Sequence, residues 1–505
     1  MLQNKEKQAS TREKVHNSMI KIRLSKELYV YDVQGLCKSF YPTEQIVISC
    51  GEKETDKNLY SIYIDIELLE DKVIIDLYAD DVSYTSQQQA DQKTGRNYKN
   101  TLKKSLYELL SKLSGKKLPW GTLTGVRPSK LAMEQIEEGR GKEQVVDYMQ
   151  KQYLCSREKS LMGYEIAKRE LDILRAIDYE NGYSLYIGIP FCPTRCHYCS
   201  FPSFPMEQFG DYMEKYLQAL FKEIAYFSKK NWKKQLTSVY VGGGTPTTLS
   251  AEQLRRLLAK IRESFPVEKA VEFTVEAGRP DTITFEKLKV LKEAGVTRIS
   301  INPQTMNEET LLRIGRKHTV SQVAYGFAMA REAGHDNINM DLIVGLPGEG
   351  EKHLEKTLDW VVDLKPDSLT VHSLVIKRAS LLNQGKEMNA QSGDVGQMLA
   401  MTADFAKKHE YLPYYMYRQK NATGTDSDSR ENVGYAKTGK ESVYNIIIME
   451  EKQSILALGA GASTKVLTPT GKKKLERVEN VKNIGDYISR IDEMIERKEN
   501  ILQFM

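Results

Sequence analysis

Cys192-Pro-Thr-Arg-Cys196-His-Tyr-Cys199 is the stretch of this 505-residue chain that decides the fold and the chemistry. It places three thiols on one short loop, whereas Cys37, Cys50 and Cys155 are isolated along the chain. Three thiolates on a compact loop suit three corners of an iron–sulfur cubane and leave the fourth iron open. The residues alone leave two alternatives: a zinc site with His197 as fourth ligand, or core thiols without a ligand.

Around this loop, between residues 181 and 390, short β-like runs alternate with longer amphipathic stretches. This alternation predicts a parallel sheet with helices outside it, because parallel strands need crossover connections. We therefore expect an α/β fold, a partial (β/α)6 barrel. The predicted strands are residues 185–189, 238–241, 271–276, 298–302, 338–344 and 368–374, and the predicted helices are residues 212–227, 251–264, 285–294, 321–333 and 352–364.

Two flanking regions differ from this core. Residues 1–180 combine four strand-like runs, at 19–24, 45–50, 59–68 and 73–78, with later helical patterns. They predict an accessory α+β domain that contains a small antiparallel sheet. Residues 391–505 predict a C-terminal cap domain, with a tyrosine-rich run from Tyr411 to Tyr417, a strand near residues 443–449 and a final helix. The tyrosine run could flank a flat aromatic macrocycle or form a strand of the cap.

Composition narrows the class of protein. The longest aliphatic runs are far shorter than the roughly 20 apolar residues that span a bilayer, so we expect no membrane span. The first 17 residues are polar, which predicts no secretory signal and a location in the cytoplasm. The net charge of +5, from 73 basic and 68 acidic residues, is too small to indicate nucleic-acid binding. Six cysteines in so long a chain argue against a disulfide scaffold.

Most predicted core strands end in polar or glycine-rich segments. The strand ends carry the run Gly242-Gly-Gly-Thr245, then Glu276, Gln304, Asp341 and His372. In β/α barrels the site lies at the carboxyl ends of the strands. We expect one pocket to collect these side chains together with the cysteine loop.

The cysteine loop resembles the C-x3-C-x2-C signature of the radical S-adenosylmethionine (SAM) enzymes, with Tyr198 at their usual aromatic position. The resemblance extends, in order, to the oxygen-independent coproporphyrinogen III oxidase family over roughly residues 186–463. Gly188 and the extra N-terminal domain look most like the HemZ-type coproporphyrinogen dehydrogenases of that family. The matching segments are residues 186–192, 242–247, Glu276, 300–304, 314–316 and 341–347.

The resemblance implies two cofactors. A [4Fe-4S] cluster would be bound by Cys192, Cys196 and Cys199, and S-adenosyl-L-methionine would bind at its open iron. The glycine run would hold the methionyl amino group, and Glu276 would accept hydrogen bonds from the ribose hydroxyls. The residues alone also allow a structural turn and an ordinary strand-end carboxylate there. The full set of implied SAM-binding residues is Tyr186, Gly243, Gly244, Thr245, Glu276, Gln304, Arg316 and Asp341.

The resemblance also implies an activity, the oxidative decarboxylation of coproporphyrinogen III to protoporphyrinogen IX in haem biosynthesis. A 5′-deoxyadenosyl radical would start the reaction, and reduced flavodoxin or ferredoxin would donate the electron. The small-molecule partner would be this tetrapyrrole, whose propionates need cations at the pocket mouth. Arg195, Arg378 and Arg418 are the candidates near matched segments.

Three residues depart from the family pattern. Phe201 stands where the oxidases carry a further cysteine, and Gly188 stands where they carry a histidine. Residues 431–435 resemble the His-Asn-x-x-Tyr segment of the related haem chaperones, but Glu431 replaces the histidine. The alternatives are therefore a haem-binding chaperone, or a radical enzyme that acts on another tetrapyrrole or on RNA.

Overall fold

Six parallel strands form the centre of the structure, a computed structural model that describes residues 19–53, 57–80, 82–125, 127–230, 232–375, 392–419, 431–468 and 474–502. Each strand pairs with the next one along the chain, so the sheet is built by successive crossovers. In order, these strands are β6 (Gly182–Ile189), β9 (Gln235–Gly243), β10 (Glu272–Glu276), β11 (Arg298–Ser300), β12 (Ile338–Val344) and β13 (Ser368–Ser373).

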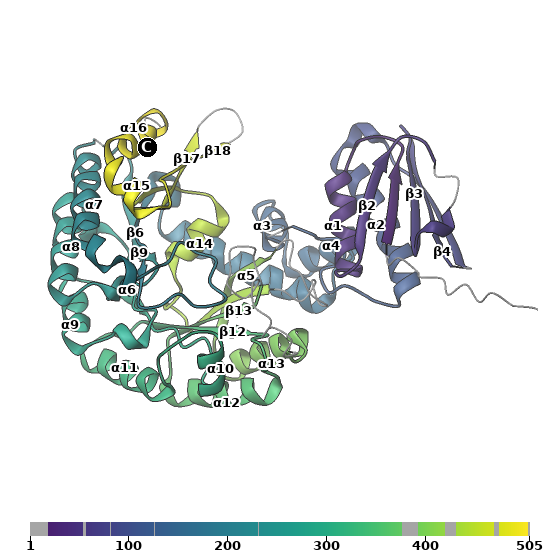
Figure 1. Ribbon diagram of the computed structural model, residues 1–505. Coiled ribbons are helices and arrows are strands. Elements are labelled where there is room, and N and C mark those ends of the chain that lie inside the picture. Colours follow the sequence, from purple (N-terminus) through teal and green to yellow (C-terminus); the bar gives the residue numbers. More distant parts are fainter. Residues whose placement is uncertain are drawn as a thin grey trace, which may run out of the picture. The chain divides into compact units, whose positions relative to one another are not determined.

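Helices cover the outer face of this curved sheet (Figure 1). α8 shows why: its leucines and Ile261 recur at helical spacing and are all buried, and Ser250 caps its first turn with Gln253 in a reciprocal pair. The predicted partial (β/α)6 barrel is therefore confirmed. The outer helices are α7 (Met213–Ser228), α8 (Ala251–Ser264), α9 (Phe285–Glu293), α10 (Glu308–Arg313), α11 (Val320–Glu332) and α12 (Glu351–Leu364).

The C-terminal part of the chain extends both edges of the same sheet. On one edge, β15 (Glu431–Ala436) pairs antiparallel with β13, and β14 (Leu412–Arg418) follows it. On the other edge, β16 (Ser454–Leu458) pairs parallel with β6. Two antiparallel strands, β17 (Ser463–Thr468) and β18 (Lys474–Glu479), continue that edge.

One predicted strand, near residues 443–449, is wrong: these residues form helix α14 (Val443–Glu450). Ser442 caps the helix by accepting a hydrogen bond from the Asn445 backbone N–H. The buried Glu272 carboxylate, at the start of β10, accepts from the N–H groups of Val443 and Tyr444. A tertiary carboxylate at the helix N-terminus thus outweighs the β propensity of the isoleucine run.

The described chain divides into two compact units. The first contains residues 19–124 and 148–159, and the second contains residues 125–147, apart from 126, and the described residues from 160 onward. The three-domain division at residues 180 and 390 stays a prediction.

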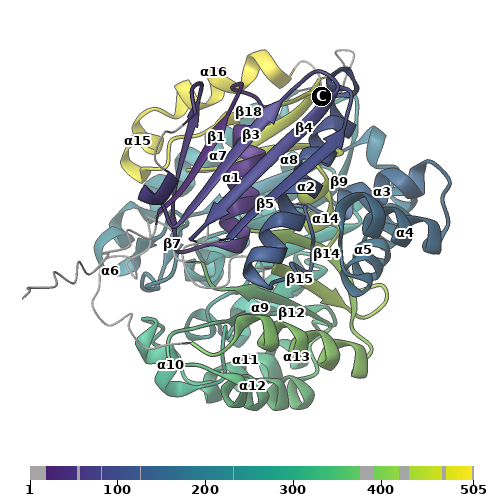
Figure 2. The same ribbon diagram turned by 90° about the vertical axis from the view of Figure 1, so that its right-hand side faces the viewer.

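The sheet of the first unit is mixed, not antiparallel as predicted from the sequence. β1 (Met19–Leu24) pairs parallel with β2 (Gln45–Cys50), because helix α1 (Val30–Phe40) carries the chain back between them, and it pairs parallel with β3 (Ile62–Leu68) on its other side. β4 (Lys72–Ala79) and β5 (Val82–Gln89) complete it as antiparallel neighbours (Figure 2). The polar strand β5 has no alternating apolar signal, and sequence reasoning missed it.

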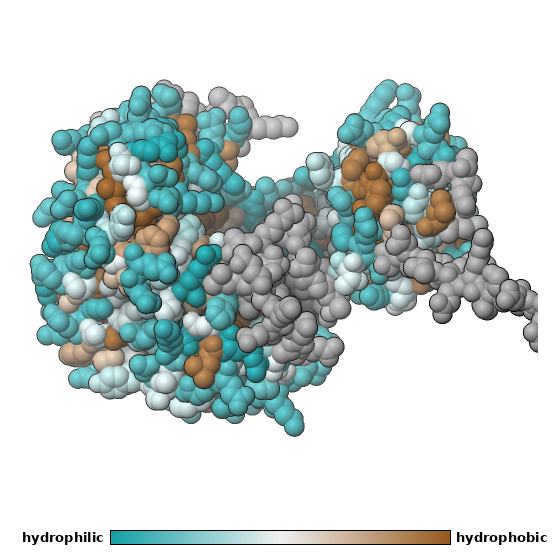
Figure 3. Space-filling model, in the orientation of Figure 1, coloured by the Kyte–Doolittle hydropathy of each residue, from teal (hydrophilic) through white to brown (hydrophobic). Residues whose placement is uncertain are grey.

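The remaining elements are short or lie beside this framework. No helix among the described residues is long and apolar enough to span a bilayer. Most of the described surface seen in Figure 3 is hydrophilic, with apolar residues in small groups.

The helices and strands not yet named are α2 (Arg96–Ser114), α3 (Ser129–Glu137), α4 (Lys142–Tyr153), α5 (Arg157–Ala176), β7 (Phe191–Cys192), β8 (Phe204–Pro205), α6 (Met206–Phe209), α13 (Val395–Lys408), α15 (Ile484–Ser489) and α16 (Ile491–Leu502).

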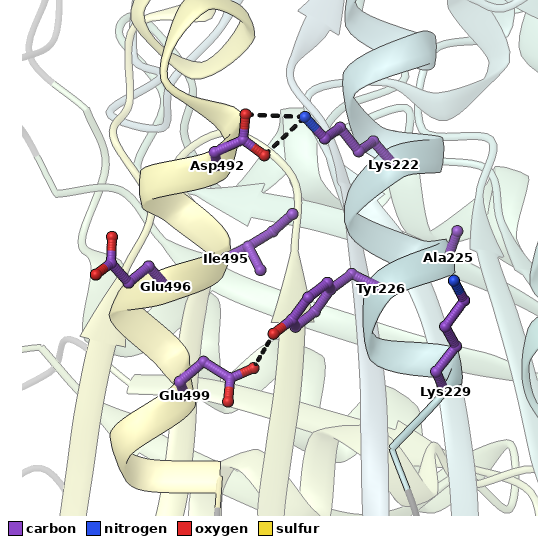
Figure 4. A pocket seen from close by; sticks show the side chains of 8 residues that line it. All are labelled: Lys222, Ala225, Tyr226, Lys229, Asp492, Ile495, Glu496 and Glu499. Atoms are coloured by element: carbon purple, nitrogen blue, oxygen red, sulfur yellow. Dashed lines mark hydrogen bonds and ion pairs between the residues drawn. The ribbon is translucent and has the colours of Figure 1, made fainter.

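Helix α16 packs against α7 through one buried and several exposed polar contacts. Lys498 forms an ion pair with Glu223, and both side chains are fully buried. The other oxygen of Glu223 accepts hydrogen bonds from the Gly459 N–H (2.8 Å) and the Tyr487 hydroxyl (2.6 Å). The same helices border a surface groove of about 440 Å³, where Lys222 pairs with Asp492 (Figure 4). Glu223 thus joins α7, the turn after β16, and α16.

We predict that Lys498→Met destabilises the protein by about 3–5 kcal/mol, the usual effect of leaving one buried charge of an ion pair uncompensated. Urea unfolding followed by circular dichroism measures the effect. Lys222→Met is the matched control, because the Lys222–Asp492 pair joins the same two helices but is exposed, and exposed pairs contribute little. Equal stability of the two variants would contradict the prediction.

Candidate functional site

The cysteine loop connects the first barrel strand to α6. Cys192 lies on β7, which pairs with β8 in a short parallel ladder. Cys192 and Cys196 are buried, and Cys199 is partly exposed. The loop rests on residues 313–315, where the His197 N–H donates to the Ile314 carbonyl at 3.0 Å and His197 Nδ1 lies 3.1 Å from the Arg313 carbonyl oxygen. The fold therefore holds the loop in place from a second segment of the chain.

Gly315 is required at this contact. Its φ is +73°, and a Cβ there would lie 2.7 Å from Nε2 of His197. The histidine ring therefore packs on Gly315 and is engaged by the Arg313 carbonyl. His197 thus has a structural role in this contact. It is the residue that would have to be the fourth ligand of a zinc site.

The three thiols of the loop interact electrostatically. Burial raises the pKa of Cys192, and burial together with the neighbouring thiols at 196 and 192 raises the pKa of Cys199 to about 11. Among the described residues, no three His, Cys, Asp or Glu side chains gather closely enough to hold one metal ion. A cubane is a different case, because each thiolate bonds its own iron. Three cysteines on one loop are the donor set that such a cluster takes from a protein.

The glycine run at the end of β9 packs directly against the cysteine strand. The Gly244 N–H donates to the Ile189 carbonyl at 2.8 Å, and the Thr245 N–H donates to the Phe191 carbonyl at 2.7 Å. A Cβ on Gly244 would lie 2.5 Å from that carbonyl oxygen. The glycine is therefore needed for close packing, and it brings the Thr245 hydroxyl to 3.5 Å from Cys192 Sγ.

Glu276 lies at the end of β10, beside this run. The Tyr240 hydroxyl donates to Glu276 Oε1 at 2.5 Å. Burial, together with the nearby Asp341 charge, raises the pKa of Glu276 to about 7, although the Tyr240 hydrogen bond works in the opposite direction. A Cβ on Gly242 would come within 2.9 Å of the Glu276 carboxyl group, so that glycine makes room for it. The Glu276 carboxyl group is thus positioned by its neighbours on β9.

Three aromatic rings stack behind Glu276. The ring centroids of Tyr186 and Tyr240 are 6.2 Å apart, and those of Tyr240 and Tyr444 are 4.5 Å apart. Tyr186 on β6 therefore belongs to the same cluster of side chains as Glu276. Tyr444 comes from α14, so the misassigned helix contributes to the interior of the barrel.

Gln304 follows β11 and pairs with the middle of β12, where Asp341 lies; Asp341 was expected at the end of that strand. Gln304 has a φ of +70°, and its N–H donates to the Asp341 carbonyl at 3.0 Å. Its side-chain Oε1 is buried without a hydrogen-bond partner among the described residues. Such an orphan acceptor is costly unless something donates to it. Gln304 is thus suited to accept a hydrogen bond from a ligand.

Asp341 and His372 face each other across neighbouring strands. Asn339 Nδ2 donates to Asp341 Oδ1 at 2.7 Å, and His372 Nε2 lies 4.0 Å from Asp341 Oδ2. Burial lowers the pKa of His372, although the Asp341 carboxylate works in the opposite direction. His372 also stands opposite Asn432 in the pairing of β13 with β15. Asn432, the residue after Glu431, thus lies beside the strand that carries His372.

Arg316 points toward the cysteine loop. Its Nη1 donates to the Tyr198 hydroxyl at 3.0 Å and lies 3.9 Å from Cys196 Sγ. Its Nη2 donates to the carbonyls of Gly278 and Asn302. Only Nε is buried without a partner among the described residues. Both Nη atoms are therefore occupied within this chain, in contrast to the free fork that a bidentate carboxylate contact needs.

The other residues singled out in the sequence are distributed as follows. Arg195 lies on the cysteine loop, Arg418 is buried on β14 opposite Glu431, and Arg378 is outside the described residues. Phe201 is 66% exposed. Cys37, Cys50 and Cys155 lie in the first unit, whereas the three cysteines of the loop lie in the second.

Sequence reasoning missed two side chains that organise the site, Tyr240 and Arg279. Tyr240 lies two residues before the glycine run, on the strand face shared with Gly242, and this period of two was a usable signal. Arg279, three residues beyond Glu276, donates to Thr194 and to Cys196 in the loop. No pattern in the sequence distinguishes Arg279 from the chain's other arginines.

The chain is similar to known proteins over most of its length. The model of the Radical SAM superfamily matches residues 186–361. The oxygen-independent coproporphyrinogen-III oxidase-like protein HemZ of Bacillus subtilis is 42% identical over 420 residues, which are 81% of this chain and 82% of that protein. The heme chaperone HemW of Bacillus subtilis is 34% identical over 284 residues, which are 55% of this chain and 70% of that protein.

A solved structure supports the fold. The coproporphyrinogen III oxidase HemN of Escherichia coli, a radical SAM enzyme, matches with a TM-score of 0.50 at 24% identity, over 64% of this chain and 73% of that one. At this identity the likeness concerns the fold alone. The long match to HemZ, together with the superfamily match over the barrel, shows the family: this chain belongs to the HemN/HemZ family of oxygen-independent coproporphyrinogen-III oxidase-like proteins within the radical SAM superfamily.

Proposed function

We propose that Cys192, Cys196 and Cys199 bind a [4Fe-4S] cluster and that S-adenosyl-L-methionine binds at its fourth iron. The three thiols share one short loop that a second segment of the chain holds in place, and this supports the first part. When bound, this pair of cofactors supplies a 5′-deoxyadenosyl radical after one-electron reduction. The residues of the chain bind and orient the cofactors and exclude water from the barrel interior.

The strand ends supply groups for each part of S-adenosyl-L-methionine. The carboxyl group of Glu276 accepts from the ribose hydroxyls, and the backbone of Gly243 and Gly244, with Thr245, holds the methionyl amino group. Gln304 and Asp341 supply further acceptors, with Gln304 Oε1 still lacking a donor. Tyr186 packs behind them. Arg316 supports this site from the side of the cysteine loop, where its Nη atoms are engaged.

We predict that Cys→Ala at 192, 196 or 199 abolishes the cluster, because each thiolate bonds one iron. Anaerobic iron and sulfide analysis with EPR on the reconstituted variants measures this. Cys37→Ala, Cys50→Ala and Cys155→Ala are the controls and should keep a full cluster. A complete [4Fe-4S] signal in Cys196→Ala would overturn the assignment.

We predict that S-adenosyl-L-methionine binds more weakly below pH 7. The ribose hydroxyls favour the charged form of Glu276, whose pKa is about 7 in the free protein. The apparent Kd should therefore rise about tenfold per pH unit below that pKa, as the competent fraction falls. Calorimetry on the reconstituted protein between pH 5.5 and 8 measures it.

The Glu276→Gln variant isolates the carboxylate. It should lose about 1–3 kcal/mol of binding free energy at pH 8, where a charged acceptor is replaced by an amide, and its Kd should no longer change with pH. Glu286→Gln, at an exposed position on α9, should behave like the unaltered protein. A Glu276→Gln variant that keeps the pH dependence would show that another group titrates.

We propose that the substrate is coproporphyrinogen III and that the product is protoporphyrinogen IX. Each of two propionates loses one hydrogen atom to the radical, then carbon dioxide and one electron, which leaves a vinyl group. An external electron acceptor takes that electron, and reduced flavodoxin or ferredoxin supplies the electron that starts the reaction. The observation that carries this proposal is the 42% identity to the oxidase-like protein HemZ across 81% of the chain.

The second candidate is a haem chaperone. It is favoured by the 34% identity to HemW and by Phe201, which stands where the oxidases carry a further cysteine. Glu431 counts against it, because the chaperones carry a histidine there. The HemW match also covers less of the chain, 55%, than the HemZ match does.

An anaerobic assay separates the two candidates. With reductant and S-adenosyl-L-methionine, we expect coproporphyrinogen III to give a tricarboxylate intermediate and then protoporphyrinogen IX. Mass spectrometry should show two successive losses of carbon dioxide with two hydrogens each, and release of 5′-deoxyadenosine. Stoichiometric haem retention with unaltered porphyrinogen would favour the chaperone instead.

A further inference from the structure

Arg279 lies three residues after Glu276, and its hydrogen bonds connect that segment to the cysteine loop. Its side chain is 4% exposed. One edge of its guanidinium forms a fork with the Asp281 carboxylate, through Nε at 2.9 Å and Nη2 at 2.7 Å. Although burial works in the opposite direction, these hydrogen bonds hold the pKa of Asp281 below its usual range. Asp281 thus fixes the plane of the guanidinium.

The other edge of the guanidinium faces the loop. Nη1 donates to the Thr194 carbonyl at 3.3 Å, to the Thr194 hydroxyl at 3.2 Å and to Cys196 Sγ at 3.5 Å. The Thr194 hydroxyl in turn donates to the Gly315 carbonyl at 3.4 Å. Arg279 therefore reaches one specific thiol of the three.

The hydrogen-bond donors around the Cys196 sulfur differ in charge from those around Cys192 and Cys199. Arg316 Nη1 lies 3.9 Å from the same sulfur, so two buried guanidinium groups face Cys196. Cys192 has neutral hydroxyl donors from Ser203 and Thr245, and Cys199 has a backbone N–H from Phe201. Arg279 and Arg195 act on these two thiols only through space, without a hydrogen bond. In a low dielectric, hydrogen bonds from charged donors stabilise a negative sulfur more than neutral ones do.

His318 lies in the positive electrostatic field of the same two arginines. Both of its ring nitrogens are buried without partners among the described residues. Burial and the charges of Arg316 and Arg279 lower its pKa to about 3. The surroundings of Cys196 thus combine two cations with a histidine that stays neutral, and Asp281 is the carboxylate that balances them.

We propose that Arg279 is a positioning residue that, with Arg316, stabilises negative charge on Cys196 and thereby raises the reduction potential of the cluster. The inference rests on the proposed [4Fe-4S] site. Reduction adds one negative charge to the cluster, and the net charge and hydrogen bonds around the sulfurs set the potential at which this occurs. Asp281 opposes the effect, since its carboxylate partly neutralises Arg279.

The test is EPR-monitored redox titration of reconstituted variants without S-adenosyl-L-methionine, so the readout does not depend on activity. Arg279→Gln removes the cation and should shift the midpoint potential to a more negative value. Asp281→Asn removes the balancing carboxylate and should shift it to a more positive value. Arg279→Lys keeps the charge without the fork and should shift it less than Arg279→Gln does.

Arg256→Gln is the matched control. Arg256 forms a comparable fork with Glu214 on the outer helices, at 3.1 and 2.6 Å, and its loss should leave the potential unchanged. Iron content and circular dichroism of each variant check assembly and folding. If Arg279→Gln does not retain a cluster, the sign of the shift in Asp281→Asn decides: a shift to a more positive potential supports the inference, and no shift or a more negative potential overturns it.

The opposite signs distinguish a tuned potential from a merely structural role. A structural role would lower iron content in both the Arg279 and Asp281 variants and leave the potential of the remaining clusters unchanged. That result, or shifts of the same sign in Arg279→Gln and Asp281→Asn, would overturn the inference. Failure of the unaltered protein to assemble a [4Fe-4S] cluster would instead refute the proposed function.

Discussion

The backbone pairing of the glycine run with the cysteine strand is the contact on which the rest of the site depends. The Gly244 N–H donates to Ile189 at the end of β6 and the Thr245 N–H donates to Phe191 on β7, and the chain comes so close to β7 that no side chain fits at position 244. This closeness puts the end of β9 beside Cys192, and the missing side chain at Gly242 opens the space that the Glu276 carboxyl group occupies. The contacts at Gly242, Gly244 and Thr245 therefore hold the ends of β6, β9 and β10 close together.

Around this contact, guanidinium groups and carboxyl groups lie on different segments, apart from Asp281, which pairs with Arg279. The cysteine loop is faced by the guanidinium groups of Arg279 and Arg316, whereas the carboxyl groups of Glu276, at the end of β10, and Asp341, within β12, act on each other. Both sets are enclosed, so each group acts strongly on its neighbours. A cluster with several negative sulfurs and a sulfonium ligand with a positive charge would each meet side chains of the complementary sign.

The sequence predicted much of this arrangement, and the failures have physical causes. Alternation of apolar runs located all six barrel strands, and the spacing of the thiols located the loop. Helix α14 was missed because its N-terminus is stabilised by Glu272, a residue far away in the chain. Arg279 was missed for the same reason: its role depends on reaching Thr194 and Cys196 across the fold. The mixed sheet of the first unit was missed because a crossover helix, and not a hairpin, joins its first two strands.

The two edges of the barrel sheet carry a consequence for how the chain is made. β6 is among the first barrel strands to be synthesised, yet its outer neighbour β16 begins only at Ser454, and β13 is covered by β15 from Glu431 onward. Until those residues leave the ribosome, both flanks of the parallel sheet present unpaired N–H and C=O groups, which can template pairing with other chains. The nascent protein therefore passes through a long interval of exposed edges, and a chain that stops short of β16 would be prone to aggregate.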